Sequence, residues 1–263
     1  MKNGMVKIKK ALISVSNKSG LKKFVSDLNS LDIKVIASGG TAKFIEDNGF
    51  NVIDIEEITG FPQLLGGRVK TIHPKIHSSI LADRGNQNHI KDLKKMEIDT
   101  IDLVVCDLYP FSDAVVKQNN IDYCVEHIDI GGITLLRAAA KNFKYVTVIT
   151  NISHYQEVID HIRKNKGYST YKFRLKKASE AFKYSCNYDL QISKWFNQFN
   201  KKEFSEFIFP NEKLEDILIY GENSHQKAAF YQNEDTKKNW GNFRKLQGKP
   251  LSFNNHLDLD ASL

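Results

Sequence analysis

The sequence has no long apolar run and few cysteines, and each shortage excludes a class of protein. No apolar stretch in the 263 residues reaches the roughly 20 residues that a membrane-spanning helix needs. The three cysteines, Cys106, Cys124 and Cys186, are widely spaced and odd in number, so they predict neither a disulfide framework nor a metal site. We therefore expect reduced thiols and no membrane partner.

The N-terminus also lacks the features of a targeting segment. It reads MKNGMVKIKKALISVS, which is basic and then apolar, but the apolar part is short and no small-residue cleavage site follows. The same residues fit a β-strand. Nor does the chain contain an internal repeat or a low-complexity tract, so we expect a cytoplasmic globular protein.

Positive charge is in excess, but it is not concentrated. The net charge is +7 and the pI is near 9.1, with lysines scattered along the chain rather than gathered in one basic arm. A nucleic-acid-binding protein usually concentrates its charge on one face. A solvated, lysine-rich surface is the better interpretation, and we expect no nucleic-acid partner. Small anionic substrates would still be attracted.

Apolar strand-like runs alternate with helix-like segments through the first half of the chain. The expected strands cover residues 11–16, 34–38, 51–55, 100–109 and 146–150. The expected helices are one capped by Ser19, one from Thr41 to a terminal Gly49, and one over 131–143. This order predicts an α/β fold, with a parallel sheet and helices on both faces.

The second half has a different character. Residues 153–165 and 170–199 have the pattern of helices, and the polar stretch 200–216 is typical of a linker. New strand-and-turn material begins at 217 and runs to 263. We therefore predict a first domain over 1–199, a linker over 200–216 and the start of a second α/β domain over 217–263.

Three segments at or near strand ends carry groups that favour an anion. The segment GGRVKT places Arg68 and Lys70 two residues apart, so in an extended chain both side chains point the same way. The other two are SGGT (38–41), at a helix start, and SVSNKSG (14–20), with Ser16, Lys18 and Ser19. A lone Gly-Gly turn is commonly only a turn. Because parallel sheets bind ligands beyond the carboxyl ends of their strands, the three together predict a phosphate site.

Three further residues could carry chemistry, although each has a plainer explanation. Asp129 precedes a Gly-Gly pair, and Lys141 lies on the helix that follows, where a solvated lysine is the usual case. At one site, each would tune the pKa of the other and suit proton transfer. Tyr109 ends a buried strand, where packing is usual, but beside Lys70 it could stabilise an oxyanion.

Two other possibilities are weaker. His73 and His77 are four residues apart in HPKIH, but no third ligand is evident and Pro74 fits the first helical position, so we expect no metal. Cys106 has no histidine placed by the sequence to activate it as a nucleophile.

At several of these segments the chain resembles one family. SVSNKSGL, ASGGTAKFI, ITGFPQLLGGRVKTIHPKIHSSIL, DLYPF and IDIGGITLLRAAAKN resemble the N-terminal domain of the bifunctional purine-biosynthesis enzyme, which joins an IMP cyclohydrolase to an AICAR transformylase. The resemblance runs from about Ala11 to Phe199. YGENSHQ and LQGKPLSFNNHLDLDA resemble the opening of the transformylase domain.

The resemblance implies a methylglyoxal-synthase-like fold and ring closure of formylated AICAR to IMP, without cofactor or metal. It implies catalytic roles for Lys70 and Tyr109 near the oxyanion, and for Asp129 and Lys141 in relaying protons. It implies a phosphorylated nucleotide as the substrate. The implied substrate-binding residues are Ser16, Lys18, Ser38, Gly39, Gly40, Thr41, Arg68, Thr71, Cys106, Asp107, Ile130 and Gly131.

The chain also departs from the family pattern. The family motif usually reads NLYPF, so Asp107 adds a negative charge, which either tunes the site differently or pairs with a nearby lysine. Ile219 stands where the family often has arginine, and Ser224 where proline is usual. The Lys-His segment of the transformylase does not occur. We therefore expect no formyl transfer from this chain alone, and 10-formyltetrahydrofolate as a cosubstrate only of the missing domain.

The resemblance further implies a homodimer in the full-length family, with much of the contact in the second domain. Residues 217–263 would then expose apolar side chains, and we expect local disorder or aggregation there. Two alternatives of the same fold remain. One is a nucleotide-sensing module without catalysis, which would not need Lys70, Tyr109, Asp129 and Lys141 together. The other is methylglyoxal synthase, against which the long second half argues.

Overall fold

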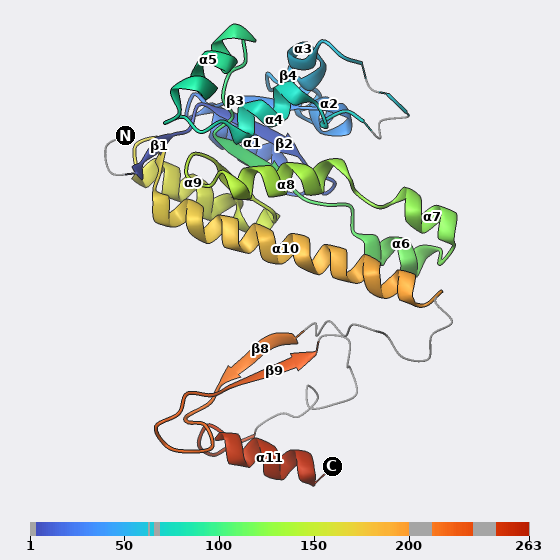
Figure 1. The fold of residues 1–263 in the computed structure, drawn as a ribbon, viewed down its shortest axis with the longest axis vertical. Coiled ribbons are helices and arrows are strands. Elements are labelled where there is room, and N and C mark those ends of the chain that lie inside the picture. Colours follow the sequence, from blue (N-terminus) through green and yellow to red (C-terminus); the bar gives the residue numbers. More distant parts are fainter. Residues whose placement is uncertain (1–3, 63, 66–68, 200–211, 234–245, 263) are drawn as a thin grey trace. The chain divides into compact units, whose positions relative to one another are not determined.

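The computed structural model describes residues 4–62, 64–65, 69–199, 212–233 and 246–262, and its chain divides into two compact units. The first unit runs from Met1 to Phe196 and the second from Asn197 to Leu263. Figure 1 shows the first unit as a sheet between helices. Each unit is described by itself.

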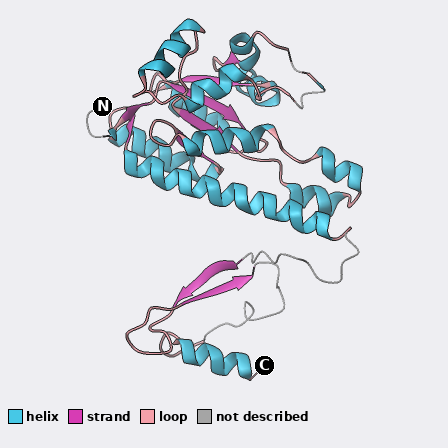
Figure 2. Ribbon diagram, viewed as in Figure 1, coloured by secondary structure: helices cyan, strands magenta, loops and turns pink. Residues whose placement is uncertain are grey.

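A five-stranded sheet forms the centre of the first unit, and all of its strand pairs are parallel. Its order is β4-β3-β2-β5-β6, so β2 lies between β3 and β5. Figure 2 shows the strands in magenta among the helices in cyan. The strands are β2 (Lys10–Ser14), β3 (Lys34–Ala37), β4 (Ile53–Asp54), β5 (Leu103–Cys106) and β6 (Thr147–Ile149). The predicted parallel sheet with helices on both faces is confirmed.

Apolar layers cover both faces of this sheet, which explains why its strands are continuous apolar runs rather than alternating ones. Along β5, Val104 and Cys106 belong to one core, and Leu103 and Val105 belong to the other. The first core includes side chains of α8 (Gly131–Lys141) and α10 (Tyr171–Asn197). The second includes side chains of α1 (Leu21–Asn29) and α9 (Tyr155–Lys164).

Shorter elements complete the first unit. The remaining helices are α2 (Gly39–Asp47), α3 (Ile55–Thr59), α4 (Pro74–Leu81), α5 (Gln87–Lys95), α6 (Phe111–Lys117), α7 (Ile121–Glu126) and the 3₁₀ turn η3 (Ile152–His154). A separate antiparallel pair joins β1 (Val6–Lys7) to β7 (Tyr168–Ser169). The helices expected after residue 153 are therefore present as α9 and α10.

Three expected boundaries were wrong. Ser19 does not cap α1, because Gly20 precedes the helix with a left-handed φ of 69° and no side-chain cap is made. The next helix begins at Gly39 rather than Thr41, with Ser38 in extended conformation before it. The strand expected over 51–55 is only β4, because Asp54 caps α3 and Ile55 already belongs to that helix. Gly49, with φ +81°, follows the end of α2 as predicted.

The described residues of the second unit form an antiparallel pair, β8 (Glu212–Ile217) and β9 (Ala229–Asn233), and one helix, α11 (Phe253–Ala261). A capping box formed by Ser252 and Asn255 begins α11. Strand β8 starts at Glu212, five residues before the expected start of the second domain at 217, because its pairing with β9 outweighs its polar composition. The remainder of that linker, 200–211, lies outside the described residues.

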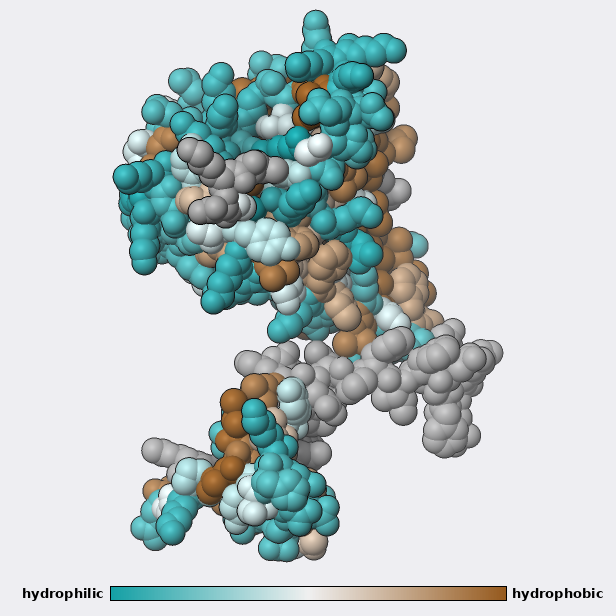
Figure 3. Space-filling model, turned by 60° about the vertical axis from the view of Figure 1, so that its left-hand side comes forward, coloured by the Kyte–Doolittle hydropathy of each residue, from teal (hydrophilic) through white to brown (hydrophobic). Residues whose placement is uncertain are grey.

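Several helices of the first unit leave large apolar side chains exposed, and Figure 3 shows such side chains gathered along one side of this unit. Leu175, Phe182 and Phe196 of α10 are each more than 40% exposed. None of the helices that the structure describes combines the length and the apolar character needed to cross a membrane.

Candidate functional site

The carboxyl ends of β2, β3 and β5 bring two of the predicted anion-binding segments, SVSNKSG and SGGT, together with Asp107 to one edge of the sheet. These strands are neighbours, with Ser14 aligned with Cys106 and Ile13 aligned with Ala37. The loop after β2, the start of α2 after β3, and Asp107 after β5 therefore lie side by side. The predicted convergence of these loops is confirmed, because parallel strands end at the same edge.

Lys18 is held inward by the loop that carries it. Its Nζ donates to Thr41 Oγ1 at 2.9 Å and also to the Val15 carbonyl oxygen. Thr41 in turn donates from Oγ1 to the Val15 carbonyl at 3.1 Å, which ties α2 to the end of β2. Burial lowers the pKa of Lys18, while Asp107 opposes that shift and Lys70 adds to it. Lys18 and Thr41 therefore form one cationic corner.

Asp107 points its carboxylate at the β2 loop. The Ser16 N–H donates to Oδ1, and the Asn17 N–H donates to Oδ2 at 3.1 Å. The Ser16 hydroxyl adds a longer contact of 3.5 Å to the carbonyl oxygen of Leu108. The extra charge of Asp107 is thus satisfied by two backbone amides, and it also acts electrostatically on Lys18.

Asp129 lies at the amino end of α8, where backbone N–H groups favour negative charge. The Gly132 N–H donates to its Oδ1 at 2.6 Å, and Asp129 is electrostatically coupled to Lys70. Burial is the largest influence and raises the pKa of Asp129, whereas the Gly132 and Tyr109 backbone amides and Lys70 partly lower it. A carboxylate with a raised pKa suits proton transfer near neutral pH.

The segment that carries Lys70 packs against the same helix start. A Cβ added at Gly131 would lie 2.6 Å from Thr71 Oγ1, so only glycine permits this approach. Thr71 is buried and Lys70 is half-buried. The charge of Lys70 acts on both Lys18 and Asp129, so this cation lies near both groups. Arg68 and the preceding Gly-Gly lie outside the described residues, so their expected roles stay predictions.

The remaining expected binding residues differ in exposure. Tyr109 and Ile130 are 53% and 55% exposed, Gly40 is exposed, and Gly39 and Gly131 are half-buried. Ser38 is buried at the start of α2. Cys106 is fully enclosed, and burial raises the pKa of its thiol well above the usual range, which disfavours a nucleophilic thiolate.

Lys141 stands apart from these residues. It is the last residue of α8 and is exposed, whereas Asp129 precedes the first residue of that helix. Ten residues separate Gly131 from Lys141, which at about 1.5 Å of rise per residue is about 15 Å along the axis. The structure therefore does not bring Lys141 to Asp129, and a shared proton relay stays a prediction.

Sequence reasoning missed three residues that contact the site. The Asn17 amide binds Asp107, and the hydroxyls of Tyr184 and Tyr188 accept the backbone N–H groups of Leu108 and Asp129. The two tyrosines are four residues apart on α10, a spacing that could have suggested a shared face. Nothing in the sequence indicated which loops that face would meet.

His73 has a structural role. Its side chain caps α4 by accepting the Lys75 N–H at Nδ1, with Pro74 at the first helical position as expected. Among the described residues, no group of three or more histidine, cysteine, aspartate or glutamate side chains is arranged to hold a metal ion.

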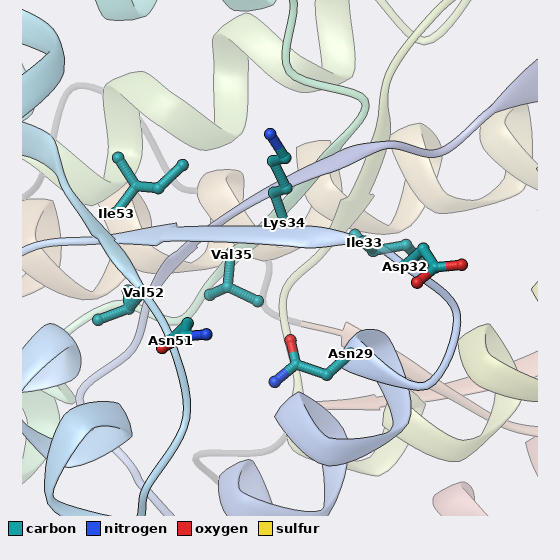
Figure 4. A pocket seen from close by; sticks show the side chains of 8 residues that line it. All are labelled: Asn29, Asp32, Ile33, Lys34, Val35, Asn51, Val52 and Ile53. Carbon is teal, nitrogen blue, oxygen red and sulfur yellow. The ribbon is translucent and has the colours of Figure 1, made fainter.

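An open depression of about 620 Å³ lies elsewhere on the first unit (Figure 4). It is lined by Asn29, Asp32, Ile33, Lys34, Val35, Asn51, Val52 and Ile53. Lys34 begins β3, so the depression lies toward the amino ends of the strands, opposite the loops described above. It is therefore separate from the candidate site.

The site thus combines cations, backbone amides and the half-buried carboxylate of Asp129. Lys18 and the start of α2 can hold a phosphate, because a helix amino terminus and a fixed ammonium both favour anions. Lys70 and Asp129 can act on a reacting group, one as a fixed positive charge and one as a proton acceptor.

Known proteins show the same organisation. A family model described as an MGS-like domain matches residues 20–134, and one described as an AICARFT/IMPCHase bienzyme matches 139–263. The crystal structure of ForH superposes with a TM-score of 0.64 at 31% identity, covering 72% of this chain and 99% of that one.

Curated relatives extend the match over nearly the whole chain. The bifunctional purine biosynthesis protein PurH of Thermoanaerobacter sp. (strain X514) is 45% identical over 97% of this chain and 50% of its own length. That of Bradyrhizobium diazoefficiens is 43% identical over 97% of this chain and 48% of its own. The chain spans about half the length of the curated relatives it matches. It belongs to the family of bifunctional purine biosynthesis proteins.

Proposed function

We propose that this chain catalyses the dehydrative ring closure of formylated AICAR to IMP, as an IMP cyclohydrolase. The observation that carries the proposal is the half-buried carboxylate of Asp129 before the start of α8, which accepts the Gly132 N–H and is close enough to Lys70 for its charge to act on it. Simple phosphate binding needs no half-buried carboxylate of raised pKa.

The chemistry suits these residues. The carboxamide nitrogen of the substrate attacks the formyl carbon of the same molecule, so the entropy cost of encounter is small and positioning matters most. Asp129 accepts the proton that leaves the carboxamide nitrogen, and its burial favours this role. Lys70 stabilises the negative charge that develops on the formyl oxygen. That oxygen leaves as water after the formamide nitrogen also gives up its proton.

The substrate phosphate would lie against the cationic corner. Lys18 and Thr41 are already joined there by a 2.9 Å hydrogen bond, and the amides at the start of α2 adjoin them. Tyr109 is exposed, so its hydroxyl is accessible to a ligand. The resemblance also implies Lys141 as a proton donor to the departing water, but this residue lies at the far end of α8, away from Asp129.

Ring closure can be measured directly. The purified chain is incubated with the formylated ribotide and purine absorbance is followed, with Lys70→Ala, Lys141→Ala and the control Lys22→Ala, an exposed lysine on α1. We expect closure by the wild type and by the control, and a loss of about 10²-fold in the Lys70 variant. An unchanged Lys141 variant would remove that residue from the mechanism.

The same experiment separates catalysis from binding. No closure by the wild type, with the ribotide still bound in calorimetry, would contradict the proposal and indicate a nucleotide-sensing module of the same fold. Asp107 would then be examined first, because it departs from the family pattern and adjoins Lys18.

A further inference from the structure

Two tyrosine side chains of α10 bind backbone amides in loops of the candidate site. The Leu108 N–H donates to the hydroxyl of Tyr184 at 3.2 Å, and the Asp129 N–H donates to the hydroxyl of Tyr188 at 2.8 Å. The two side chains are one helical turn apart, so they project from the same face of α10. One helix therefore holds two loops that are distant in sequence.

Both backbone amides lie outside the regular elements. Leu108 follows the end of β5 at Cys106, and Asp129 precedes the start of α8 at Gly131. A buried amide without an acceptor is costly, and neither sheet nor helix supplies one at these positions. The two phenol oxygens supply that acceptor.

The two amides bound by these tyrosines belong to segments with proposed roles in ring closure. Leu108 lies between Asp107, which binds the β2 loop, and Tyr109, whose backbone amide interacts with the Asp129 carboxylate. Asp129 also accepts the Gly132 N–H at 2.6 Å. The Asp129 carboxylate is thus fixed through its own backbone by Tyr188, and the adjoining segment is fixed by Tyr184.

Burial keeps both phenols neutral. Tyr188 is only 6% exposed, and burial raises its pKa to about 12. Burial also raises the pKa of Tyr184. A neutral phenol accepts an amide hydrogen without bringing a second negative charge beside Asp129.

We propose that Tyr184 and Tyr188 are positioning residues for ring closure, which fix the Tyr109 segment and the Asp129 carboxylate relative to the substrate. The inference rests on the proposed function. Tyr188 has the larger effect, because it holds the residue that accepts the proton.

The contacts can be tested without any assay of activity. Tyr184→Phe and Tyr188→Phe each remove one hydroxyl, and Tyr171→Phe is the matched control, since Tyr171 is 46% exposed near the start of the same helix. By NMR, we expect the Leu108 amide to exchange about 10-fold faster in the first variant and the Asp129 amide about 10-fold faster in the second. Unchanged exchange at both amides would overturn the inference.

Kinetics then distinguish positioning from a general structural role. We expect Tyr188→Phe to lower kcat about 10-fold and Tyr184→Phe to lower it less, with IMP affinity within twofold of wild type. The Tyr171→Phe control keeps wild-type kcat. A parallel loss of IMP binding and thermal stability, or an unchanged kcat in both variants beside an active wild type, would overturn the positioning role. An inactive wild type would instead overturn the proposed function.

Discussion

At the scale of single residues, the structure shows where the carboxylate of Asp107 points. From the sequence, this charge could either face the substrate or be paired within the protein. The carboxylate accepts the N–H groups of Ser16 and Asn17, and it raises the pKa of Lys18 against the effect of burial. Asp107 therefore shapes the loop that carries Lys18.

Asp107→Asn tests this assignment. An asparagine keeps one acceptor oxygen but presents an NH₂ group to the second amide, so we expect the free energy of unfolding to fall by about 1 kcal/mol. Urea unfolding at pH 7 measures it, with Asp92→Asn, an exposed position on α5, as the control. Equal stability of the two variants would contradict the role of the carboxylate in the loop.

Asp129→Asn should change activity and stability in opposite directions. Because burial raises the pKa of Asp129, the folded state disfavours the ionised carboxylate. Its contribution to stability is present below the unfolded pKa and is lost as pH rises through the folded value. At pH 7 we therefore expect the uncharged variant to unfold at a higher urea concentration than wild type, while kcat falls about 10²-fold or more. A variant that is less stable at pH 7 but equally stable at pH 3 would contradict the assigned sign.

At the scale of elements, the contact between α9 and α10 depends on an ionic cluster. Lys177 is buried, and its Nζ lies 2.6 Å from Glu157 Oε2 and 2.8 Å from Glu180 Oε2. The hydrogen bond from Lys177, followed by that from Lys176, lowers the pKa of Glu157 to about 2. This cluster fixes α10, which in turn presents Tyr184 and Tyr188 to the site.

Because the pKa of Glu157 is lowered in the folded protein, we expect the protein to lose stability in acid. A depressed folded pKa stabilises the protein above the unfolded value of about 4.5, and that stability is lost as pH falls toward about 2. Glu157 is 38% exposed, so screening reduces the contribution to about 1–2 kcal/mol. We expect Glu157→Gln to lose about this much at pH 7 and to match wild type near pH 2. A constant difference at both pH values, measured by urea unfolding, would contradict the linkage.

At the scale of the whole molecule, the two units differ in how well they bury apolar surface. The first has a parallel sheet covered by two cores. In the described part of the second unit, the strands form one two-stranded pair, on which Ile217 and Tyr231 are 72% and 53% exposed. A two-stranded sheet alone is marginally stable in water.

Hydrogen exchange tests this difference. We expect amides in β8 and β9 to exchange at least about 10²-fold faster than those in β2 and β5, because a two-stranded pair is less stable than a five-stranded sheet between two apolar cores. Mass spectrometry of proteolytic fragments measures both in one experiment, with the sheet of the first unit as the internal control. Protection of the second unit to the level of the first would contradict the expectation of local disorder.

Local signals in the sequence predicted most of the first unit. Its apolar runs 34–38 and 146–150 marked buried strands, and Gly49 marked the end of a helix, since burial on both faces and left-handed φ values constrain residue type directly. The helix starts expected at Ser19 and Thr41 were wrong. Gly20, in a left-handed conformation, directly precedes α1, and Gly39 is already the first residue of α2. The placement of Lys141 on α8 was foreseen, but not its distance from Asp129.

The sequence by itself determined the alternation of strands and helices, the parallel sheet and the loops that meet at its carboxyl edge, because each depends on neighbouring residues and on backbone periodicity. The tertiary structure decided where Asp107 points, why Asp129 has a raised pKa, and which loops Tyr184 and Tyr188 hold. These depend on contacts such as Ser16 with Asp107, which are 91 residues apart. Burial and hydrogen bonding over such separations arise only when the chain has folded.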